Sequence, residues 1–241
     1  MTSEHLVPQI CLVVKWSVNP AAEPVALELA RRLAGDGIAA TWAVASASQV
    51  EKLRKATAKA GQLSVALAAA PHGVDQSGNW VREITSSLNG LRASGANVAT
   101  MQTAGQPPRG NYERAIHALG IRAIIVDAAA QTAGVRPLPF GLWQLTPRLA
   151  MPTVRRWTRL FSRSPRLLID RTDATPALAS IDAARLASAG SRATREVERT
   201  IQQLVQAKRL GTVAVVTAEE IAEQLASTNA ARPQRSILRA A

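Results

Sequence analysis

Two kinds of hydrophobic pattern alternate along most of the chain. Continuous apolar runs, such as residues 10–15, are typical of strands that are buried on both faces. Between these runs, apolar residues recur three or four positions apart, which predicts amphipathic helices. The expected strands are residues 10–15, 38–45, 63–68, 97–101, 121–126, 166–169 and 212–216. The expected helices are residues 24–34, 49–60, 78–94, 111–119, 176–189, 194–210 and 218–226.

Glycine repeatedly stands between an expected helix and the strand that follows it. The positions are Gly37, Gly61, Gly95, Gly120 and Gly211. A glycine there closes the helix, because it adopts a positive φ without steric cost. Alternating helices and buried strands predict an α/β fold with parallel strands, and about seven strands suit an irregular (β/α)7-type barrel. Ligands of such folds bind where strands end and helices begin, so we expect functional residues at the strand ends.

One segment departs from this repeat, and a second segment lies after the end of the repeat. Residues 134–166 carry five prolines and two tryptophans, and residues 152–162 have the spacing of a short helix with arginines on its outer face. We interpret this segment as a cross-over or lid at one barrel end, with a basic amphipathic element as the alternative. Residues 227–241 form a polar, basic tail that we expect to fray. The pattern elsewhere does not break, which indicates one domain over residues 1–226.

Composition narrows the class of protein. No apolar run approaches the roughly 18–20 residues that cross a bilayer. The first nine residues contain no Lys or Arg, so they do not resemble a signal peptide, and we expect a cytoplasmic protein. Cys11 is the only cysteine, which rules out an internal disulfide and a cysteine-based zinc site.

The net charge of +12 bears on possible partners. A basic surplus is typical of proteins that bind nucleic acid, an anionic membrane or an acidic polymer. It also arises from an arginine-rich composition alone, which is the interpretation that we favour here. We therefore do not expect nucleic acid or a membrane as partner, although the charge leaves both open.

The stretch from Gln102 to Asp127 has the composition of a binding face. Pro107 and Pro108 start a rigid turn that ends at Gly110, a short amphipathic helix follows, and an apolar strand then stops at Asp127. Proline fixes φ and glycine permits a positive φ, so such a turn presents its backbone in one shape. A loop of this kind at the end of a strand belongs to a binding face.

Four stretches, taken in order, carry a resemblance to a known family. Residues 37–44 read Gly-Ile-Ala-Ala-Thr-Trp-Ala-Val, and residues 105–110 read Gly-Gln-Pro-Pro-Arg-Gly. Residues 167–170 read Leu-Leu-Ile-Asp, and residues 211–217 read Gly-Thr-Val-Ala-Val-Val-Thr. Their order and spacing resemble the polysaccharide deacetylase family, the NodB-homology carbohydrate esterases, over residues 10–226. The resemblance implies an irregular (β/α) barrel and a carbohydrate substrate.

The family's catalytic residues do not carry over, so the resemblance implies a degenerate site. The family has a pair of aspartates after the first strand, where residues 14–18 contain no carboxylate. Leu67 and Pro71 stand at the positions of the metal-binding histidines, Gln106 at the arginine of the Pro-Pro loop, and Ile169 at the late histidine. A divalent metal needs several converging His or carboxylate ligands. We therefore predict no metal and no cofactor, and no classical deacetylase activity.

Three functions follow from these observations. The first is a non-catalytic or repurposed NodB-like domain, a pseudoenzyme that binds a carbohydrate or another polar ligand at the strand ends. The second is a hydrolase of carbohydrate amide or ester bonds with a rearranged acid/base or metal site. The third is a basic module that binds nucleic acid or anionic lipid. The identity of the ligand and the oligomeric state do not follow from the sequence.

Candidate site residues belong to the first two of these functions. The predicted ligand-binding side chains are Lys15, Ser17, Gln106, Arg109 and Trp143. The predicted acid/base groups of a hydrolase are His72, Asp127, Asp170 and Asp173.

Several of these candidates have a structural interpretation as well. Asp127 and Asp170 follow expected strands, where a carboxylate often caps the next helix. His72 lies in a loop, beside a proline and a glycine. Lys15 ends a buried strand, and such a lysine ordinarily extends to solvent, whereas a buried one supplies an amine with a shifted pKa.

Overall fold

A curled sheet of ten strands organises the computed structural model, which describes residues 7–57, 63–69, 79–104, 111–127, 133–151 and 176–230. The strands are β1 (Gln9–Lys15), β2 (Thr41–Val44), β3 (Ser64–Ala69), β4 (Thr100–Thr103), β5 (Ala123–Val126), β6 (Gly134–Pro137), β7 (Trp143–Thr146), β8 (Leu149–Met151), β9 (Ala177–Asp182) and β10 (Ala214–Val216). The helices are α1 (Ala22–Gly35), α2 (Ala47–Ala56), α3 (Asn79–Ala93), α4 (Asn111–Ala118), the short 3₁₀ helix η1 (Pro139–Gly141), α6 (Ala183–Ser188), α7 (Gly190–Arg209) and α8 (Ala218–Ala230).

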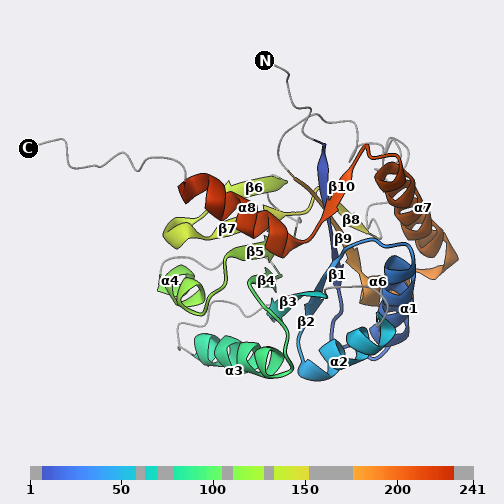
Figure 1. Cartoon of the computed structure of the whole chain (residues 1–241). Helices are drawn as coiled ribbons and strands as arrows, with labels where there is room; N and C mark the ends of the chain where they lie inside the picture. Colours follow the sequence, from blue (N-terminus) through green and yellow to red (C-terminus); the bar gives the residue numbers. More distant parts are fainter. Residues whose placement is uncertain are drawn as a thin grey trace, which may run out of the picture.

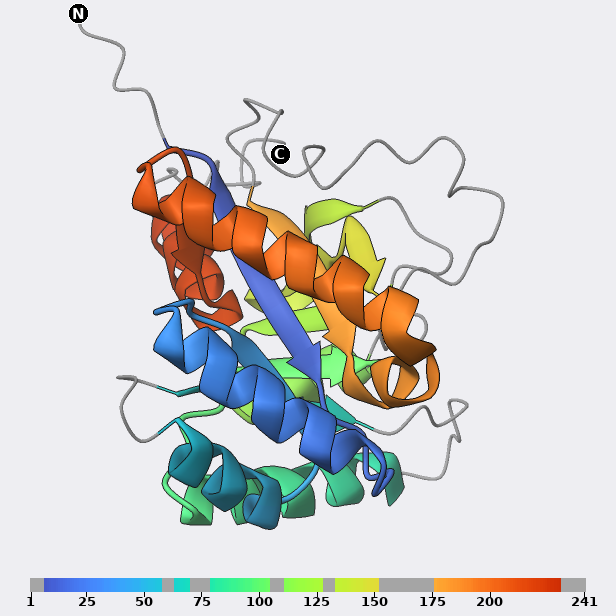
Figure 2. The ribbon, with the colours of Figure 1, turned by 90° about the vertical axis from the view of Figure 1, so that its right-hand side faces the viewer.

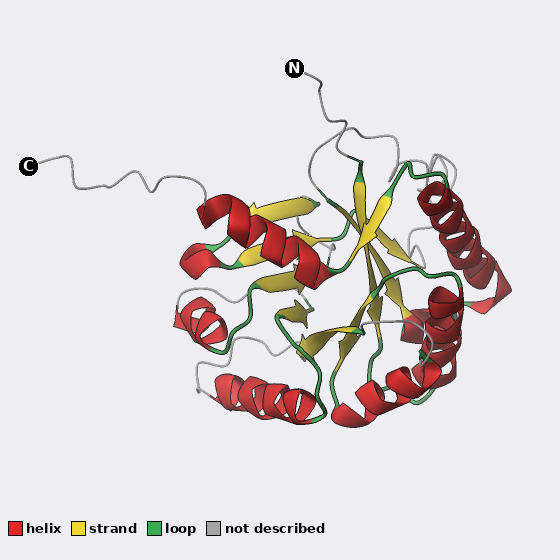
Figure 3. Cartoon of the chain, in the orientation of Figure 1, coloured by secondary structure: helices red, strands yellow, loops and turns green. Residues whose placement is uncertain are grey.

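The strand order is β6-β7-β5-β4-β3-β2-β1-β9-β8, with β10 paired to β1. Neighbouring strands are parallel, except that β6 runs antiparallel to β7. The sheet curls into a half-barrel, with most helices on its outer side (Figures 1 and 3). The prediction of an α/β fold with mostly parallel strands is confirmed. The antiparallel pair at the β6 edge is the one departure among the described strand pairs.

Strand β1 is the centre of this arrangement because it has three partners. Strand β9 pairs along Ile10–Lys15, whereas β10 pairs with Gln9–Cys11 and β2 with Val13–Lys15. Strands β10 and β2 therefore share one edge of β1, one beside its amino half and the other beside its carboxyl half. The backbone N–H of Ala218 donates a hydrogen bond to Oγ1 of Thr41 over 2.8 Å, which joins the end of β10 to the start of β2.

The two faces of the sheet bury different cores. On the outer face, helices α1 and α7 lie over β1 (Figure 2). They share one apolar core with alternate strand residues, including Leu12 and Val14 of β1. On the inner face, Cys11 and Val13 of β1 pack with Ile221 and other residues of α8. Successive strand residues point to opposite faces, so the two sets alternate along each strand. Helix α8 contacts β1, β4 and β5 and fills the concave side of the half-barrel.

The largest difference from the predicted elements lies at residues 176–189, expected as one helix. The first half is strand β9, and only Ala183–Ser188 is helical, as α6. The segment Ala-Leu-Ala-Ser-Ile-Asp has residues that are acceptable in helices. Strand β9 pairs with β1 along one edge and with β8 along the other, and its side chains are buried in the two cores of the sheet. This tertiary context outweighs the weak local preference.

The proline-rich segment also differs from its prediction in the part that the structure describes. Residues 134–151 form β6, η1, β7 and β8, so this part of the expected cross-over or lid is built into the sheet. The expected helix at 152–162 and strand at 166–169 lie outside the described residues. Helix α8 continues to Ala230, into the segment that was expected to fray from residue 227.

Glycines at helix ends and one helix cap show how the local sequence decides where helices begin and end. Gly37, Gly95, Gly120 and Gly211 all have a positive φ at the ends of helices. Thr217 and Glu220 form a capping box at the start of α8: the Thr217 Oγ1 accepts from the N–H of Glu220 over 3.2 Å, and the Glu220 carboxylate accepts from the N–H of Thr217 over 2.6 Å. None of the described helices is long and apolar enough to cross a membrane.

Candidate functional site

The candidate site is an ion pair that crosses the inner face of the half-barrel. Lys15 is the last residue of β1, and the alternation that puts Cys11 and Val13 on the inner face directs its side chain the same way. Its ammonium pairs with Oδ1 of Asp127, which directly follows β5. Strands β1 and β5 are separated in the sheet by β2, β3 and β4, so only the curl of the sheet brings these two side chains together.

The pair is mostly buried but remains open to solvent on one side. The exposed fraction is 15% for the Lys15 side chain and 30% for that of Asp127. Solvent therefore reaches part of both side chains, and bulk water screens their charges only partly. The structural expectation that Lys15 simply extends to solvent is wrong, and the alternative of a buried amine describes the structure.

Two further charged groups lie beside Lys15. Asp182, the last residue of β9, is the register partner of Lys15 on the neighbouring strand. Its carboxylate accepts a hydrogen bond from the N–H of Arg185 over 3.0 Å and so caps α6. Its second oxygen lies 3.4 Å from Nε of Arg185. The site thus holds two carboxylates and two cations, which come from β1, the end of β5, β9 and α6.

These surroundings change the acidity of the lysine. Burial lowers the pKa of Lys15 from 10.5 to about 8, because the charged ammonium loses solvation. Attraction to Asp182 opposes this effect and repulsion from Arg185 adds to it. The amine therefore changes its protonation state close to neutral pH, which an ordinary lysine does not.

The first turn of α2 fixes the backbone next to Lys15. The Gln49 side chain donates to the carbonyl oxygen of Trp16 over 3.1 Å and accepts from the N–H of Ala45 over 2.8 Å. Ser46 completes a capping box with Gln49 at the start of α2. Because one buried amide ties the end of β1 to the end of β2, the backbone that carries Lys15 is held in place.

A buried polar residue also belongs to this face. Gln102 on β4 is in register with Ala68 and with Ile125, which both pack on the inner face. Its side chain is buried, and it lies on the same face as Lys15 and Asp127. The amide adds a donor and an acceptor to the two charged groups.

The remaining predicted site residues are Ser17, Trp143 and five residues outside the described part of the chain. Ser17 is exposed directly after β1, two residues beyond Lys15. Trp143 begins β7 and is in register with Ala123, the first residue of β5, so it lies about four strand residues, or roughly 13 Å, from the level of Asp127. The candidates outside the described residues are His72, Gln106, Arg109, Asp170 and Asp173.

Sequence reasoning missed three residues of this site, namely Gln49, Asp182 and Arg185. Asp182 was placed inside an expected helix, which hid its position at a strand end. A Ser-x-x-Gln signature at Ser46–Gln49 was available as a helix-start signal, but it gives no hint of the contact with Trp16. Among the described residues, no three His, Cys, Asp or Glu side chains gather in a way that could hold a metal ion.

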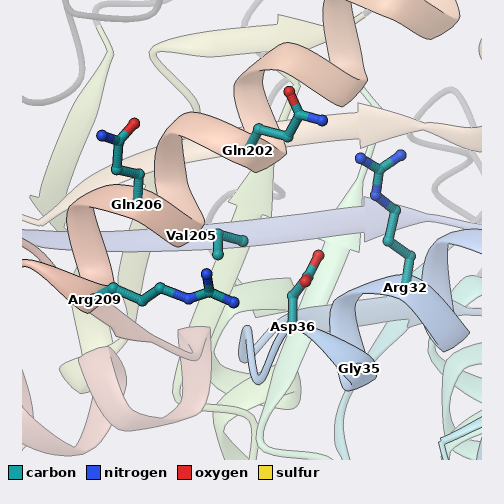
Figure 4. A pocket seen from close by; sticks show the side chains of 7 residues that line it. All are labelled: Arg32, Gly35, Asp36, Gln202, Val205, Gln206 and Arg209. Carbon is teal, nitrogen blue, oxygen red and sulfur yellow. The ribbon is translucent and has the colours of Figure 1, made fainter.

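A separate cavity of about 670 Å³ lies in the outer helical layer (Figure 4). It is formed between the end of α1 and the second half of α7, and the labelled side chains of Figure 4 point around an open groove. The lining residues are Arg32, Gly35, Asp36, Gln202, Val205, Gln206 and Arg209. Helices α1 and α7 stand on the outer face of the sheet, so this groove is distinct from the site at Lys15.

Comparisons with known proteins bear on the fold. No family model and no curated protein matches the sequence. The 4-alpha-glucanotransferase from Thermococcus litoralis matches with a TM-score of 0.60 and 11% identity, over 90% of this chain and 40% of its own. A putative polysaccharide deacetylase involved in O-antigen biosynthesis, from Bordetella bronchiseptica, gives 0.54 and 10%, over 84% and 79%. The allantoinase PuuE gives 0.56 and 12%, over 94% and 93%.

These matches define the class of fold. The chain has the NodB-like fold of the polysaccharide deacetylases, a curled and mostly parallel half-barrel, at low sequence identity. The resemblance inferred from the four sequence stretches is confirmed at the level of the fold. The chain spans 40% of the length of the glucanotransferase, so that match covers only a part of the larger protein.

Proposed function

We propose that this chain is a repurposed deacetylase-fold domain, which binds a carbohydrate or a similar polar ligand at its strand ends without a divalent metal. The observation that carries the proposal is the ion pair between Lys15 and Asp127. Lys15 lies in the stretch where the resemblance places a pair of catalytic aspartates. A cation therefore stands where the family has carboxylates.

A fixed ammonium at this place opposes metal binding in two ways. It engages Asp127, the carboxylate that would otherwise be available as a ligand. It also repels a divalent ion, by roughly 8 kcal/mol for charges 4 Å apart at an effective dielectric constant near 20. A metal would have to displace the lysine or overcome this repulsion with ligands from outside the described residues.

The same groups are suited to hydroxyl-rich ligands. The Lys15 ammonium donates hydrogen bonds, the Asp127 carboxylate accepts them, and the buried amide of Gln102 does both. Sugar hydroxyls donate and accept, so they match a face on which donors and acceptors alternate. Hydrogen bonds to charged groups contribute about 1.5–3 kcal/mol each, which favours a specific over a diffuse interaction.

The first experiment combines metal analysis with ligand binding. The metal content of the purified protein is measured by mass spectrometry, and a glycan array followed by calorimetry gives the ligand and its affinity. We expect no stoichiometric metal, and a loss of affinity of about tenfold or more for Lys15→Met and Asp127→Asn. Lys52→Met and Glu23→Gln are the matched controls, because Lys52 and Glu23 form an ion pair of 2.6 Å on the surface, away from the site.

Two results would overturn this proposal. One is stoichiometric metal together with release of acetate from acetylated oligosaccharides, which would support the hydrolase instead. The other is a glycan affinity that Lys15→Met and Asp127→Asn leave equal to that of the surface-pair controls. In that case the ligand would bind elsewhere on the molecule.

A second candidate function rests on the outer face of α7. Arg192, Arg195 and Arg199 recur three or four residues apart in the first half of α7, Arg209 lies at its end, and all four are exposed. Such a row of cations favours a polyanion such as nucleic acid. Binding of a labelled oligonucleotide should then fall steeply with salt, and Arg195→Gln with Arg199→Gln should flatten that dependence. A salt-independent or undetectable association would remove this candidate.

A further inference from the structure

We propose that Lys15 forms an imine with the aldehyde or ketone group of a small, open-chain hydroxy-carbonyl compound. The strand-end face would then capture its ligand covalently. This inference rests on the proposed function in one respect, since the same face must admit a polar molecule. It goes beyond that function because it assigns a reaction to a single atom, Nζ of Lys15.

The position of the amine is the first argument. Lys15 ends β1 on the concave side of the half-barrel, and its side chain retains 15% exposure. Gln49 holds the backbone of the next residue through the Trp16 carbonyl, so the base of the lysine is fixed. An amine in this position is largely shielded from bulk solvent, and part of its side chain is still exposed.

The charge balance around the amine is the second argument. The neutral amine is the nucleophile, so a reactive lysine must lose its proton near neutral pH. Burial lowers the pKa of Lys15 to about 8, with Arg185 of α6 contributing repulsion and Asp182 of β9 opposing the change. Asp127, after β5, contacts the ammonium directly, and this ion pair favours the charged form and so opposes the loss of the proton. These are the described charged groups that face the amine.

The reaction balances without any redox partner. Asp127 takes a proton from the ammonium, and the freed amine attacks the carbonyl carbon while one of its two remaining N–H protons passes to the carbonyl oxygen. The resulting carbinolamine loses its hydroxyl group as water, with the proton returned by Asp127, and a protonated C=N bond forms. The sum is one ammonium group plus one carbonyl compound giving one protonated imine plus one water. Asp127 is placed for both proton transfers because it touches Nζ.

The other described lysines supply internal controls. Lys52 is paired with Glu23, Lys55 is exposed on α2, and Lys208 donates to the carbonyl oxygen of Gly37. All three lie in the outer helical layer. Any carbonyl compound that modifies amines without selection should reach them at least as readily as Lys15.

The test is reductive trapping on the full chain. The protein is incubated with glycolaldehyde or, separately, with dihydroxyacetone, each with sodium cyanoborohydride, and then digested with Glu-C. Mass spectrometry quantifies the reduced adduct at each lysine. At pH 8 we expect Lys15 to react about tenfold faster than Lys55 or Lys208. Half of an amine with a pKa near 8 is neutral at this pH, against less than about 1% of an ordinary lysine. A less basic amine is also a weaker nucleophile, which offsets part of that advantage.

Variants separate the lysine from the aspartate. Lys15→Arg keeps the positive charge and should abolish the adduct on the peptide that contains position 15. Asp127→Asn should slow trapping at pH 9, where the amine is already mostly neutral, because the proton-transfer group is gone. An unchanged rate at pH 9 would refute the assigned role of Asp127.

The outcomes distinguish this inference from the proposed function. Labelling of Lys15 no faster than that of Lys55 and Lys208 in the native protein would refute the imine. Reversible glycan binding without an adduct at Lys15 would also refute it, while the proposed function stands. Selective labelling of Lys15 in a protein that binds no glycan would support the imine and remove the carbohydrate ligand.

Discussion

The burial of Lys15 makes a prediction about how stability depends on pH. In the folded chain the pKa of Lys15 is about 8, whereas an unfolded chain has the ordinary value of 10.5. Between these values the unfolded state binds a proton that the folded state has released. Stability therefore rises with pH through this window, and below about pH 8 both states are protonated and the contribution is at its least favourable.

The size of the effect follows from the two pKa values. A shift of one pKa unit corresponds to about 1.4 kcal/mol, so the full window corresponds to about 3 kcal/mol in the free energy of unfolding. Other groups titrate over the same range. Burial raises the pKa of Cys11 from 9.0 to about 12, and this thiol makes stability fall as pH rises through that interval.

A difference measurement isolates the lysine. Urea unfolding of the wild type and of Lys15→Met is followed at several pH values from 7 to 10.5, and the two free energies are subtracted. Cys11 is present in both proteins, so its contribution cancels. We expect wild-type stability to gain about 3 kcal/mol relative to Lys15→Met across the series. Lys52→Met, from the surface pair, should show no comparable trend.

If the difference between wild type and Lys15→Met stays flat from pH 7 to 10.5, the folded-state pKa of Lys15 is ordinary. The amine would then be fully protonated at neutral pH. That result would also remove the second argument for imine formation.

Three other predictions concern the packing around the site. Cys11 is fully buried with a raised pKa, so iodoacetamide should label it only in urea, and labelling of the native protein at pH 8 would contradict its burial. Thr217→Ala removes one half of the α8 capping box and should cost about 0.5–2 kcal/mol by urea unfolding, whereas Thr217→Ser should cost less. Ile221→Ala empties part of the inner core and should cost about 2–5 kcal/mol, and a cost below about 1 kcal/mol would argue against α8 filling the concave face.

The strands that the sequence predicted well are those that are buried on both faces. Strand β1 and strand β5 are buried on both faces, and a continuous apolar run carries that information locally. Strand β9 escaped detection because its small residues have no strong preference, and its neighbours β1 and β8 decide its structure. The short strands of residues 134–151 escaped for a related reason, since prolines at 137 and 139 obscure an edge hairpin.

The candidate site was predictable only in part. The position of Lys15 at a strand end, and that of Asp127 at another, follow from the apolar runs that precede them. Their contact does not, because it depends on how far the sheet curls between β1 and β5. The location of Asp182 could not be found while β9 was interpreted as helix. Contacts across a curled sheet join residues far apart in sequence, and local patterns contain no measure of that curvature.

Along the strands, the inner face of the half-barrel changes from an apolar core to a pair of charged side chains. In the amino half, Cys11 of β1 and Ala123 of β5 belong to one apolar core with Ile221 of α8. At the carboxyl ends, the oppositely charged side chains of Lys15 and Asp127 form an ion pair where apolar side chains would otherwise pack. Paired charges that are largely buried contribute little net stability, since desolvation offsets their attraction. A chain selected for stability alone would favour apolar side chains at both positions, which is a reason to assign the pair to ligand binding.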